Sequence, residues 1–212
     1  MRAIIFVNGQ FHNPEIARQY IQPDDYIIAV NGGTRHALLL DVLPDVIIGD
    51  QDSLPTDAAS RLKDTNVRFL TYPAQKDETD LELALLHAVE QHCTRILLLA
   101  AFGGRIDQGF ANMFLLTLPE LQGIDVRILD SNQTAFLIRD EAAISGNIGD
   151  TVSVLPFAGD AIGVTNSGFK WPLHNATLSL GTTRGISNVL LEKYATIRIK
   201  EGMLLCVVTQ QR

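Results

Sequence analysis

The stretch ETDLELALLHAVEQHCTRILLLA, residues 78–100, contains the two periodicities that decide the fold of this chain. Residues 78–92 place apolar side chains at three- and four-residue spacing, which predicts a helix with one buried face. The residues expected on that face are Leu81, Ala84, Leu85, Ala88 and His92. Residues 96–100 are continuously apolar, as in a strand that is buried on both faces of a sheet. A helix that leads into such a strand is typical of an α/β fold.

The same alternation extends over the first 130 residues. Short apolar runs, bounded by Gly, Asn or Asp and separated by helical segments, occur at 3–7, 26–30, 46–48, 67–70 and 126–129. Strands and helices in this order predict an α/β domain over residues 1–130, with a mostly parallel, doubly wound sheet.

The pattern of residue types changes after residue 131. Helical periodicity gives way to short β-rich segments at 151–155, 195–199 and 204–209, which are separated by Gly-containing turns. Residues 196–200 alternate polar and apolar side chains, as a half-buried antiparallel strand does. We therefore expect an all-β sandwich over residues 131–212, and because a domain of about 80 residues buries little surface, we expect it to pack against a partner subunit.

The composition excludes several classes of function. The formal net charge of −7 removes the broad positive field that unspecific binding to nucleic acids or acidic membranes requires. No apolar run approaches the roughly 18 to 20 residues that span a bilayer. The two cysteines, Cys93 and Cys206, imply no disulfide framework, which fits a reducing cytoplasm. We expect a cytoplasmic protein with neither nucleic acid nor membrane as a partner.

Three acidic motifs lie in the predicted α/β domain, at residues 49–53, 76–80 and 103–107. Each follows an apolar run or opens a helix, so in an open α/β sheet they would meet in the crevice at the carboxyl ends of the strands. Several carboxylates in one crevice raise the cost of ionising each other unless a cation lies among them. Magnesium bound to a polyphosphate is the natural candidate.

The first motif carries Asp50 and Asp52 directly after a predicted strand. Side chains two residues apart on an extended segment point to the same side, so both carboxylates can reach one ion. The alternative is a polar turn after the strand, in which Ser53 caps the next helix.

The second motif contains Lys76, Asp77 and Asp80. Asp77 is a good helix N-cap and Asp80 is three residues further on, so both can serve the helix start and its dipole. The functional alternative directs Asp80 toward a metal ion and Lys76 toward a phosphate.

Two glycine turns are candidates for phosphate binding. Gly104 and Arg105 precede a helical segment, where backbone amides and a forked guanidinium suit an anion. Asn31, Gly32 and Gly33 form a similar turn after the strand at 26–30. The Lys-Ser/Thr of a Walker motif is absent, so the chain is not an ordinary P-loop protein.

The β-rich half has its own candidates for binding. Residues 165–173 contain the only tryptophan, Trp171, beside Pro172 and polar turn residues, and either a core position or a binding groove would accommodate it. Residues 185–188 offer the small polar side chains of Ser187 and Asn188. The five histidines show no spacing suited to zinc.

The order of these motifs resembles the thiamine pyrophosphokinase family. The matching stretches are residues 44–54, 76–80, 103–107, 167–173 and 185–188. The resemblance implies an α/β domain followed by a β-sandwich, and transfer of a diphosphate from ATP to thiamine. It also implies a homodimer, with thiamine held between the α/β domain of one subunit and the β domain of the other.

The resemblance also assigns roles to residues. It implies that magnesium is held by Asp50, Asp52 and Asp80, with Asp77 and Asp107 lining the same site. ATP would lie near Lys76, Arg105 and Asn112, and thiamine would contact Trp171, Ser187 and Asn188. The chain departs from the family at Asn31, where an Asp is frequent, and at Gln108, where a His is frequent.

In this reading the hydroxyl of thiamine attacks the β-phosphorus of ATP in line and expels AMP, while the protein positions the reactants and neutralises charge. Asp77 and Asp107 are both candidates for accepting the hydroxyl proton. Two other functions remain open from the sequence. One is a pyrophosphokinase for another heterocyclic alcohol such as a pterin, and the other is a non-catalytic sensor of nucleotide or thiamine.

Overall fold

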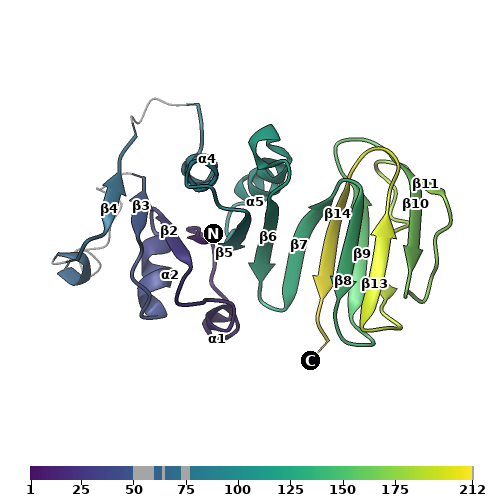
Figure 1. The fold of residues 1–212 in the computed structure, drawn as a ribbon, viewed down its shortest axis with the longest axis horizontal. Helices are drawn as coiled ribbons and strands as arrows, with labels where there is room; N and C mark the ends of the chain where they lie inside the picture. Colours follow the sequence, from purple (N-terminus) through teal and green to yellow (C-terminus); the bar gives the residue numbers. More distant parts are fainter. Residues whose placement is uncertain (50–59, 64, 73–76, 212) are drawn as a thin grey trace. The chain divides into compact units, whose positions relative to one another are not determined.

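The computed structural model describes residues 1–49, 60–63, 65–72 and 77–211. The chain forms two compact units, Met1–Ser131 and Asn132–Arg212 (Figure 1). The first unit contains the helices and a parallel sheet, and the second consists of antiparallel strands. An α/β fold followed by an all-β fold, as the sequence predicts, is therefore confirmed.

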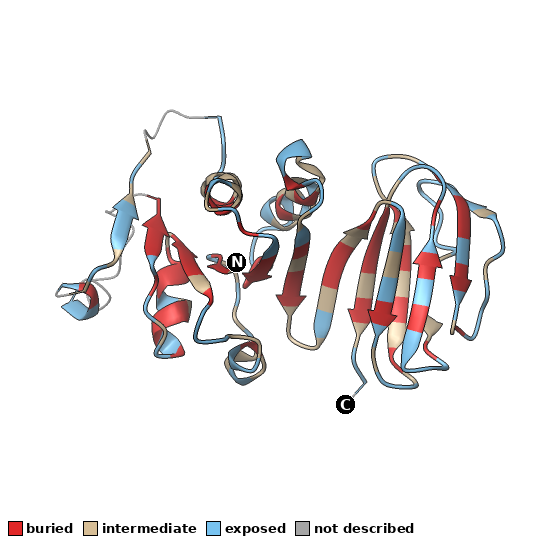
Figure 2. Ribbon diagram, in the orientation of Figure 1, coloured by how far each residue is buried: buried red, intermediate tan, exposed pale blue. Residues whose placement is uncertain are grey.

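The sheet of the first unit contains six described strands in the order β6-β5-β1-β2-β3-β4, and neighbouring strands are parallel. Their bounds are β1 Arg2–Phe6, β2 Tyr26–Val30, β3 Val46–Ile48, β4 Arg68–Leu70, β5 Arg95–Leu99 and β6 Asp125–Asp130. The inner strands are almost continuously buried, as Figure 2 shows, which is why their sequences are apolar without alternation.

Helices cover both faces of this sheet. The helices with fully described bounds are α1 Pro14–Arg18, α2 Gly33–Leu39, α4 Asp80–Glu90 and α5 Ile106–Phe114, and α5 is followed by the 3₁₀ turns η2 Leu115–Thr117 and η3 Pro119–Leu121. Alternate residues of one strand serve the two faces. In β2, Ile27 belongs to the core cluster that contains Ala17 of α1, whereas the neighbouring Tyr26 reaches His87 of α4. Figure 1 likewise shows α4 and α5 on the opposite side of the sheet from α1. The sheet is doubly wound.

Helix α4 buries most of the predicted face, but it begins later and ends earlier than the predicted span of residues 78–92. Leu81, Ala84, Leu85 and Ala88 are buried. The N-cap is Thr79, whose hydroxyl accepts a hydrogen bond from the backbone N–H of Glu82 at 3.2 Å. The expectation that Asp77 caps the helix is therefore wrong, and Asp77 is exposed two residues before the cap.

The assignment of His92 to the buried face of α4 is also wrong. The helix ends at Glu90, and His92 follows with φ +58° and an exposed side chain. A residue in the left-handed region just past a helix stops it, and here it lets the chain turn into β5.

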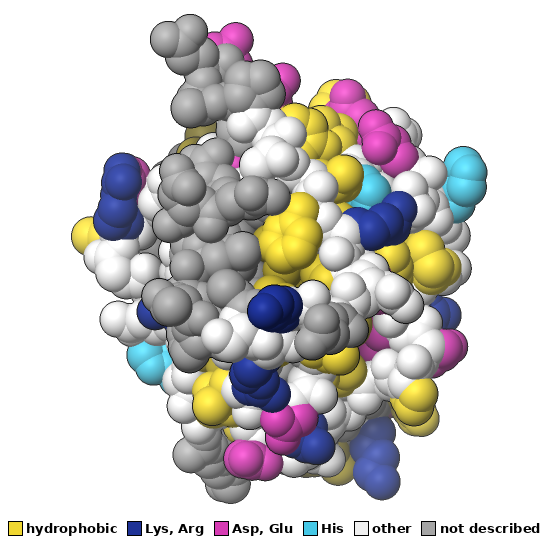
Figure 3. All heavy atoms as spheres, turned by 90° about the vertical axis from the view of Figure 1, so that its left-hand side faces the viewer, with side chains coloured by type: hydrophobic (Ala, Val, Ile, Leu, Met, Phe, Trp, Pro, Cys, Tyr) yellow, Lys and Arg dark blue, Asp and Glu magenta, His cyan; other side chains and the backbone are white. Residues whose placement is uncertain are grey.

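Strand β4 differs from the buried strand that its sequence predicts. Arg68 and Phe69 are exposed, and β4 is the outermost of the described strands of its sheet. Figure 3 views the molecule from this side and shows hydrophobic side chains interspersed with basic and acidic ones. Nη2 of Arg68 donates to the Tyr26 hydroxyl at 2.6 Å, which ties this edge back to β2.

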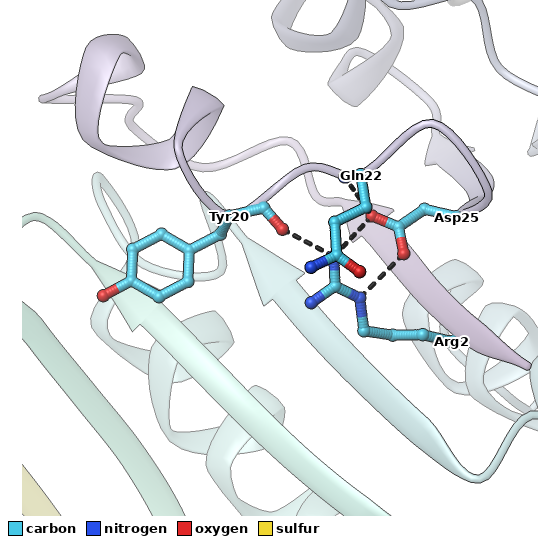
Figure 4. Close-up of polar contacts among 4 residues, drawn as sticks. All are labelled: Arg2, Tyr20, Gln22 and Asp25. Atoms are coloured by element: carbon cyan, nitrogen blue, oxygen red, sulfur yellow. Dashed lines mark hydrogen bonds and ion pairs between the residues drawn. The ribbon is translucent and has the colours of Figure 1, made fainter. Parts of the chain in front are cut away.

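A charged cluster fixes the first crossover at the amino ends of the strands (Figure 4). Arg2 donates from Nε and Nη2 to the two carboxylate oxygens of Asp25, at 2.7 and 2.6 Å, and Nη2 also donates to the carbonyl of Tyr20 at 2.6 Å. The backbone N–H of Gln22 donates to Asp25 at 2.7 Å. A bidentate pair with a buried carboxylate holds the start of β1 against the loop that enters β2.

The second unit is a sandwich of two antiparallel sheets. One has the strand order β12-β9-β14-β7 and the other β11-β10-β13-β8. The bounds are β7 Gln133–Ile138, β8 Glu141–Ser145, β9 Thr151–Pro156, β10 Ala161–Ser167, β11 Ala176–Leu178, β12 Asn188–Val189, β13 Tyr194–Arg198 and β14 Leu204–Thr209. One hydrophobic cluster joins the two sheets, for example Phe136 of β7 and Ile197 of β13.

The alternating pattern near the C-terminus behaves as predicted, because β13 alternates exposed and buried residues along its length. Cys93 and Cys206 are both buried. Within the described part of the chain, no helix has the length and apolar character needed to cross a membrane.

Candidate functional site

A cavity of about 560 Å³ lies at the carboxyl ends of the central strands of the first unit. Its walls come from the loops after β1, β2 and β5 and from the first turns of α4 and α5. The loop after β1 leads to α1 on one face of the sheet, and the loop after β5 leads to α5 on the other. The cavity therefore occupies the point where the strand order reverses, which is where open α/β sheets bind their ligands.

The loops after β1 and β5 are joined by backbone hydrogen bonds that continue beyond the strands. Gly9 N donates to the carbonyl of Ala100 at 2.8 Å, and Gln10 N donates to that of Phe102 at 2.7 Å. A Cβ on Gly9 would lie 2.2 Å from the Phe102 oxygen, so this approach requires glycine. On the other side, Nε2 of His36 donates to the Gly9 carbonyl at 3.0 Å. This wall of the cavity is fixed before any ligand binds.

Asn31 joins three elements at the other side of the cavity. It follows β2 with φ +48°, and its backbone N–H donates to Ile48 of β3 at 3.0 Å. Its side-chain amide donates to the carboxylate of Asp80, the first residue of α4. A Cβ on Gly49 would lie 1.7 Å from Oδ1 of Asn31, so the chain after β3 also packs on this side chain.

These contacts bear on the predicted magnesium ligands. Asp50, Asp52 and Lys76 lie outside the described residues, and Asp80 is the described member of the predicted set. Gly49 packs against the same Asn31 side chain that binds Asp80. The described residues alone contain no group of three side chains suited to a metal.

The donor chemistry at this point fits magnesium. Asp80 offers carboxylate oxygens, the hard ligands that Mg²⁺ takes, and lies in the cavity wall beside Glu78. Its position in the first turn of α4 also stabilises its negative charge through the helix dipole.

The glycines of the Asn31 turn have a packing reason of their own. A Cβ on Gly32 would lie 2.1 Å from Oδ1 of Asn8, and one on Gly33 would lie 2.1 Å from the carbonyl of Phe6. Both glycines are buried, and of this turn it is Asn31 that lines the cavity. The glycines therefore bring α2 close to β1, and their contact with ATP stays a prediction.

The turn before α5 places Gly104 and Arg105 in the cavity wall. Gly104 has φ +84°, which accounts for glycine there. The guanidinium of Arg105 forms a two-pronged contact with Asp107, with Nε 3.1 Å from Oδ1 and Nη2 bound to Oδ2. This contact lowers the pKa of the exposed Asp107 carboxyl. The guanidinium of Arg105 is therefore bound to the Asp107 carboxylate, and a phosphate that binds Arg105 would have to replace this carboxylate.

Asn112 has a positioning contact. It is buried in α5, and its Nδ2 donates to the carbonyl of Ala101 at 2.6 Å, which fastens α5 to the end of β5. Asp77 and Asp107, which are described, do not belong to the wall of this cavity. Their role toward a ligand stays a prediction.

Part of this wall was not predicted from the sequence. Asn8 and Gly9 line the cavity. Gln108, at which the chain departs from the family, lines it as well. The signal for the first two was present, because an apolar run followed by Asn-Gly at residues 3–9 repeats the pattern that ends in Asn31-Gly32.

A second cavity, of about 310 Å³, opens in the β unit and is lined in part by Trp171, Pro172 and Asn188. Trp171 is 52% exposed, so the alternative that placed it in the core is wrong. Ser187 does not line this cavity and has φ +62°, and its backbone N–H donates to Oγ of Ser153 at 3.0 Å. Asn166 and Arg184 also line the cavity and were not anticipated from the sequence.

Comparison with known proteins gives a consistent result for both units. Residues 17–128 match the family described as "Thiamin pyrophosphokinase, catalytic domain". Residues 138–204 match the family described as "Thiamin pyrophosphokinase, vitamin B1 binding domain". Each match falls within one of the two units.

Individual relatives agree with the family matches. The thiamine pyrophosphokinase of Bacillus subtilis is 32% identical over 182 residues, which cover 85% of each chain. The crystal structure of a thiamine pyrophosphokinase from Bacillus subtilis superposes with a TM-score of 0.90 at 27% identity and covers all of both chains. A structure from Geobacillus thermodenitrificans gives a TM-score of 0.87 at 28% identity, and the match covers all of this chain and 98% of that one.

Proposed function

The chain belongs to the thiamine pyrophosphokinase family, and on that premise we propose that it transfers the diphosphate of ATP to the hydroxyl of thiamine, giving thiamine diphosphate and AMP. The observation that carries the proposal is the cavity at the strand-order reversal, where the acidic start of α4 faces the glycine-arginine turn before α5. An anionic ligand and its cation need both kinds of group in one place.

The reaction is an in-line substitution at phosphorus. The thiamine oxygen forms a bond to the β-phosphorus of ATP, the bond from that phosphorus to the oxygen bridging the α-phosphate breaks, and AMP departs. The hydroxyl proton passes to a carboxylate, for which Asp77 and Asp107 are the candidates. The protein contributes mainly position and charge neutralisation.

We assign ATP to the cavity of the first unit. Arg105 is the described cation in its wall, and it would exchange its contact with Asp107 for a phosphate, since a guanidinium fork suits both anions. Gly104 allows backbone amides to approach the phosphates at the start of α5. Lys76, from outside the described residues, is assigned to the same phosphates.

Magnesium is the proposed cofactor, held by Asp80 together with Asp50 and Asp52. When bound, it neutralises negative charge on the phosphates and orients them. Asn31 orients Asp80 through the side-chain hydrogen bond between them.

We assign thiamine to the cavity of the β unit. An indole face attracts a cationic thiazolium by roughly 0.5 to 2 kcal/mol and also covers flat apolar surface. Trp171 is exposed in the wall of that cavity and is available for this contact. Ser187 and Asn188 stay assigned to thiamine as well.

A homodimer is the proposed assembly, and helix α5 supports it. Ile106, Phe110 and Phe114 lie four residues apart on one face of α5 and are 79%, 53% and 55% exposed. An exposed apolar stripe of this kind marks an interaction surface. A second copy would cover this stripe. In the proposed dimer, thiamine lies between the α/β domain of one subunit and the β domain of the other.

The expected location is the cytoplasm, without nucleic acid or membrane as partners. Two cysteines far apart in the sequence imply no disulfide framework, which suits a reducing compartment. The net charge of −7 disfavours association with polyanions.

The deciding experiment incubates the protein with ATP, magnesium and thiamine and identifies both products. We expect AMP and thiamine diphosphate in equal amounts. The Asp80→Asn variant should form both products only at a small residual rate. Formation of ADP and thiamine monophosphate would replace the proposal with a simple kinase. Turnover only with a pterin alcohol would support that substrate, and binding without turnover would indicate a sensor.

A further inference from the structure

We propose that Asn166 and Asn188 are positioning residues for thiamine, because together they hold the backbone of residues 171–173 so that the Trp171 indole forms a preset wall of the cavity. The proposal rests on the proposed function, since it takes thiamine as the ligand of this cavity. It assigns Asn188 a role through Trp171 and adds Asn166, which has no role in the sequence analysis.

Asn188 binds both backbone groups of Trp171. Its Oδ1 accepts a hydrogen bond from Trp171 N at 3.0 Å, and its Nδ2 donates to Trp171 O at 2.7 Å. Oδ1 also accepts from Val189 N at 2.9 Å. An asparagine amide has two acceptor positions and two donor hydrogens, so three of its four positions are committed to the backbone.

Asn166 binds both backbone groups of Leu173. Its Oδ1 accepts from Leu173 N at 2.7 Å, and its own backbone N–H donates to Leu173 O at 3.1 Å. Nδ2 lies 3.4 Å from Trp171 O. Asn166 is buried on β10, only 6% exposed, so its amide is a fixed part of the sandwich.

The backbone of residues 171–173 needs such support. Residues 171–173 lie between β10 and β11 and belong to no strand, and Pro172 has no N–H to donate. The two amides therefore replace the hydrogen bonds that a neighbouring strand would provide. They pair with Trp171 and Leu173, one on each side of the proline.

The indole itself is only half buried. About half of Trp171 is exposed, and Nζ of Lys170 lies 4.8 Å from the ring centroid. Fixing a flat side chain in its bound position before the ligand arrives removes an ordering cost from binding. A backbone held at both ends restricts the positions open to the indole while part of the side chain stays accessible.

The proposal differs measurably from a direct contact of Asn188 with thiamine. A direct contact acts only when thiamine is present. A positioning role already shows in the protein without substrate, as a change in the environment and mobility of Trp171. Because Trp171 is the only tryptophan, its fluorescence reports this residue alone.

The test compares Asn188→Ala with Ser167→Ala. The second variant removes a side-chain hydrogen bond to Thr196 at 2.9 Å in the same sandwich and leaves residues 171–173 untouched. For each protein without substrate, we measure fluorescence anisotropy of Trp171 and its quenching by iodide. Thiamine affinity is measured by calorimetry, and the KM values for thiamine and ATP are measured by turnover.

We expect Asn188→Ala to lower the anisotropy and raise the quenching of Trp171 without substrate. Its Kd and KM for thiamine should rise about 10-fold, corresponding to about 1.4 kcal/mol, with the KM for ATP unchanged. Ser167→Ala should match the wild type in all of these. Asn166→Ala should act in the same direction as Asn188→Ala, and thermal unfolding shows whether this buried variant remains folded.

Unchanged quenching and anisotropy in Asn188→Ala would overturn the proposal, even with weaker thiamine binding, because the residue would then act by direct contact. A more mobile Trp171 with unchanged thiamine affinity would also overturn it. Failure of the proposed function shows separately, as the absence of thiamine diphosphate from the wild-type reaction, since the fluorescence and calorimetric measurements require no turnover.

Discussion

Asn31 is the residue at which this chain departs from the family's frequent aspartate, and the structure gives its amide a specific partner. The side-chain N–H₂ donates to Asp80, and the side-chain oxygen faces Gly49. An aspartate could not donate this hydrogen bond. It would instead place a second carboxylate beside Asp80, which a cation would have to compensate.

Asn31→Asp should therefore make stability depend on magnesium. We expect a loss on the order of 1 kcal/mol with EDTA, or about 2 to 4 °C in Tm for a chain of this size, and recovery when Mg²⁺ is added. Differential scanning calorimetry with and without Mg²⁺ measures this.

Asn31→Gly is the matched control, because glycine suits the φ of +48° and removes the hydrogen bond without adding charge. Its Tm should respond to Mg²⁺ no more than that of the wild type. An equal response of Asn31→Asp and Asn31→Gly would contradict the charge explanation.

The residues of the site were only partly predictable from sequence. Asn31 and Asp80 were singled out separately, but their contact joins residues 49 positions apart, and no local pattern encodes it. Trp171 was left between core and groove for the same reason, since its exposure depends on amides from β10 and β12. The residue types indicated which side chains can bind ligands, whereas the contacts between these side chains could be known only from the fold.

At the scale of single elements, the N-terminus of α4 separates a structural role from a functional one. Thr79 caps the helix, and Asp77 does not. Thr79→Ala should cost about 0.5 to 2 kcal/mol of unfolding free energy, because the N–H of Glu82 loses its partner. Asp77→Ala should leave that free energy unchanged.

Urea unfolding of the two variants checks this, with Thr79→Ser as a conservative replacement that should restore the loss. If Asp77→Ala proved as destabilising as Thr79→Ala, the assignment of the cap would be wrong. Activity of a stable Asp77→Ala then reports on its proposed role as proton acceptor.

Helix α4 is also linked to β2 through His87. This buried side chain lies 3.0 Å from the Tyr26 hydroxyl, with Glu90 and Arg68 nearby. Burial lowers the pKa of His87, and Glu90 partly offsets this. Burial also lowers the pKa of His36, beside the cavity.

Because the folded pKa of His87 is below its unfolded value of about 6.5, the unfolded chain takes up the proton first. The contribution of His87 to stability is therefore present above about pH 6.5 and is lost as the pH falls below it. His87→Gln should flatten the fall in unfolding free energy between pH 7 and 5. An unchanged slope in His87→Gln would refute the assignment.

The types of the elements were predictable because burial of one face produces a periodic pattern of apolar residues in the sequence. The boundaries of the elements were not predictable. Thr79 and Asp77 are both good N-caps, and the entry of the chain into α4 decides between them. The run 67–70 resembles a buried strand in composition, but β4 is the outermost described strand, and Arg68 and Phe69 are exposed. The position of a strand in the sheet order is a property of the whole domain, so it cannot be predicted from the three residues of the strand.

At the scale of the whole molecule, the stripe on α5 predicts the state of association. Replacing both Phe110 and Phe114 by Glu places charges where a second copy would bury apolar surface, and should convert a dimer to a monomer. Light scattering after size-exclusion chromatography distinguishes the two masses.

Leu39→Glu, on α2 and 63% exposed, tests an apolar side chain outside the stripe and should remain dimeric. A monomeric wild type, or a dimeric Phe110 and Phe114 variant, would show that α5 is not the interface.

The edge at β4, the outermost strand among the described residues of its sheet, bears on what happens when many copies meet. An open strand edge can recruit a strand from another molecule, and repeated recruitment builds fibres. β4 offers only three residues, and its first, Arg68, carries a charge and is tied to Tyr26. A short, charged edge resists strand addition, so association through the α5 stripe is favoured over association at β4. When two copies bury the same surface against each other the contact closes on itself, and crowding then yields finite pairs rather than growing filaments.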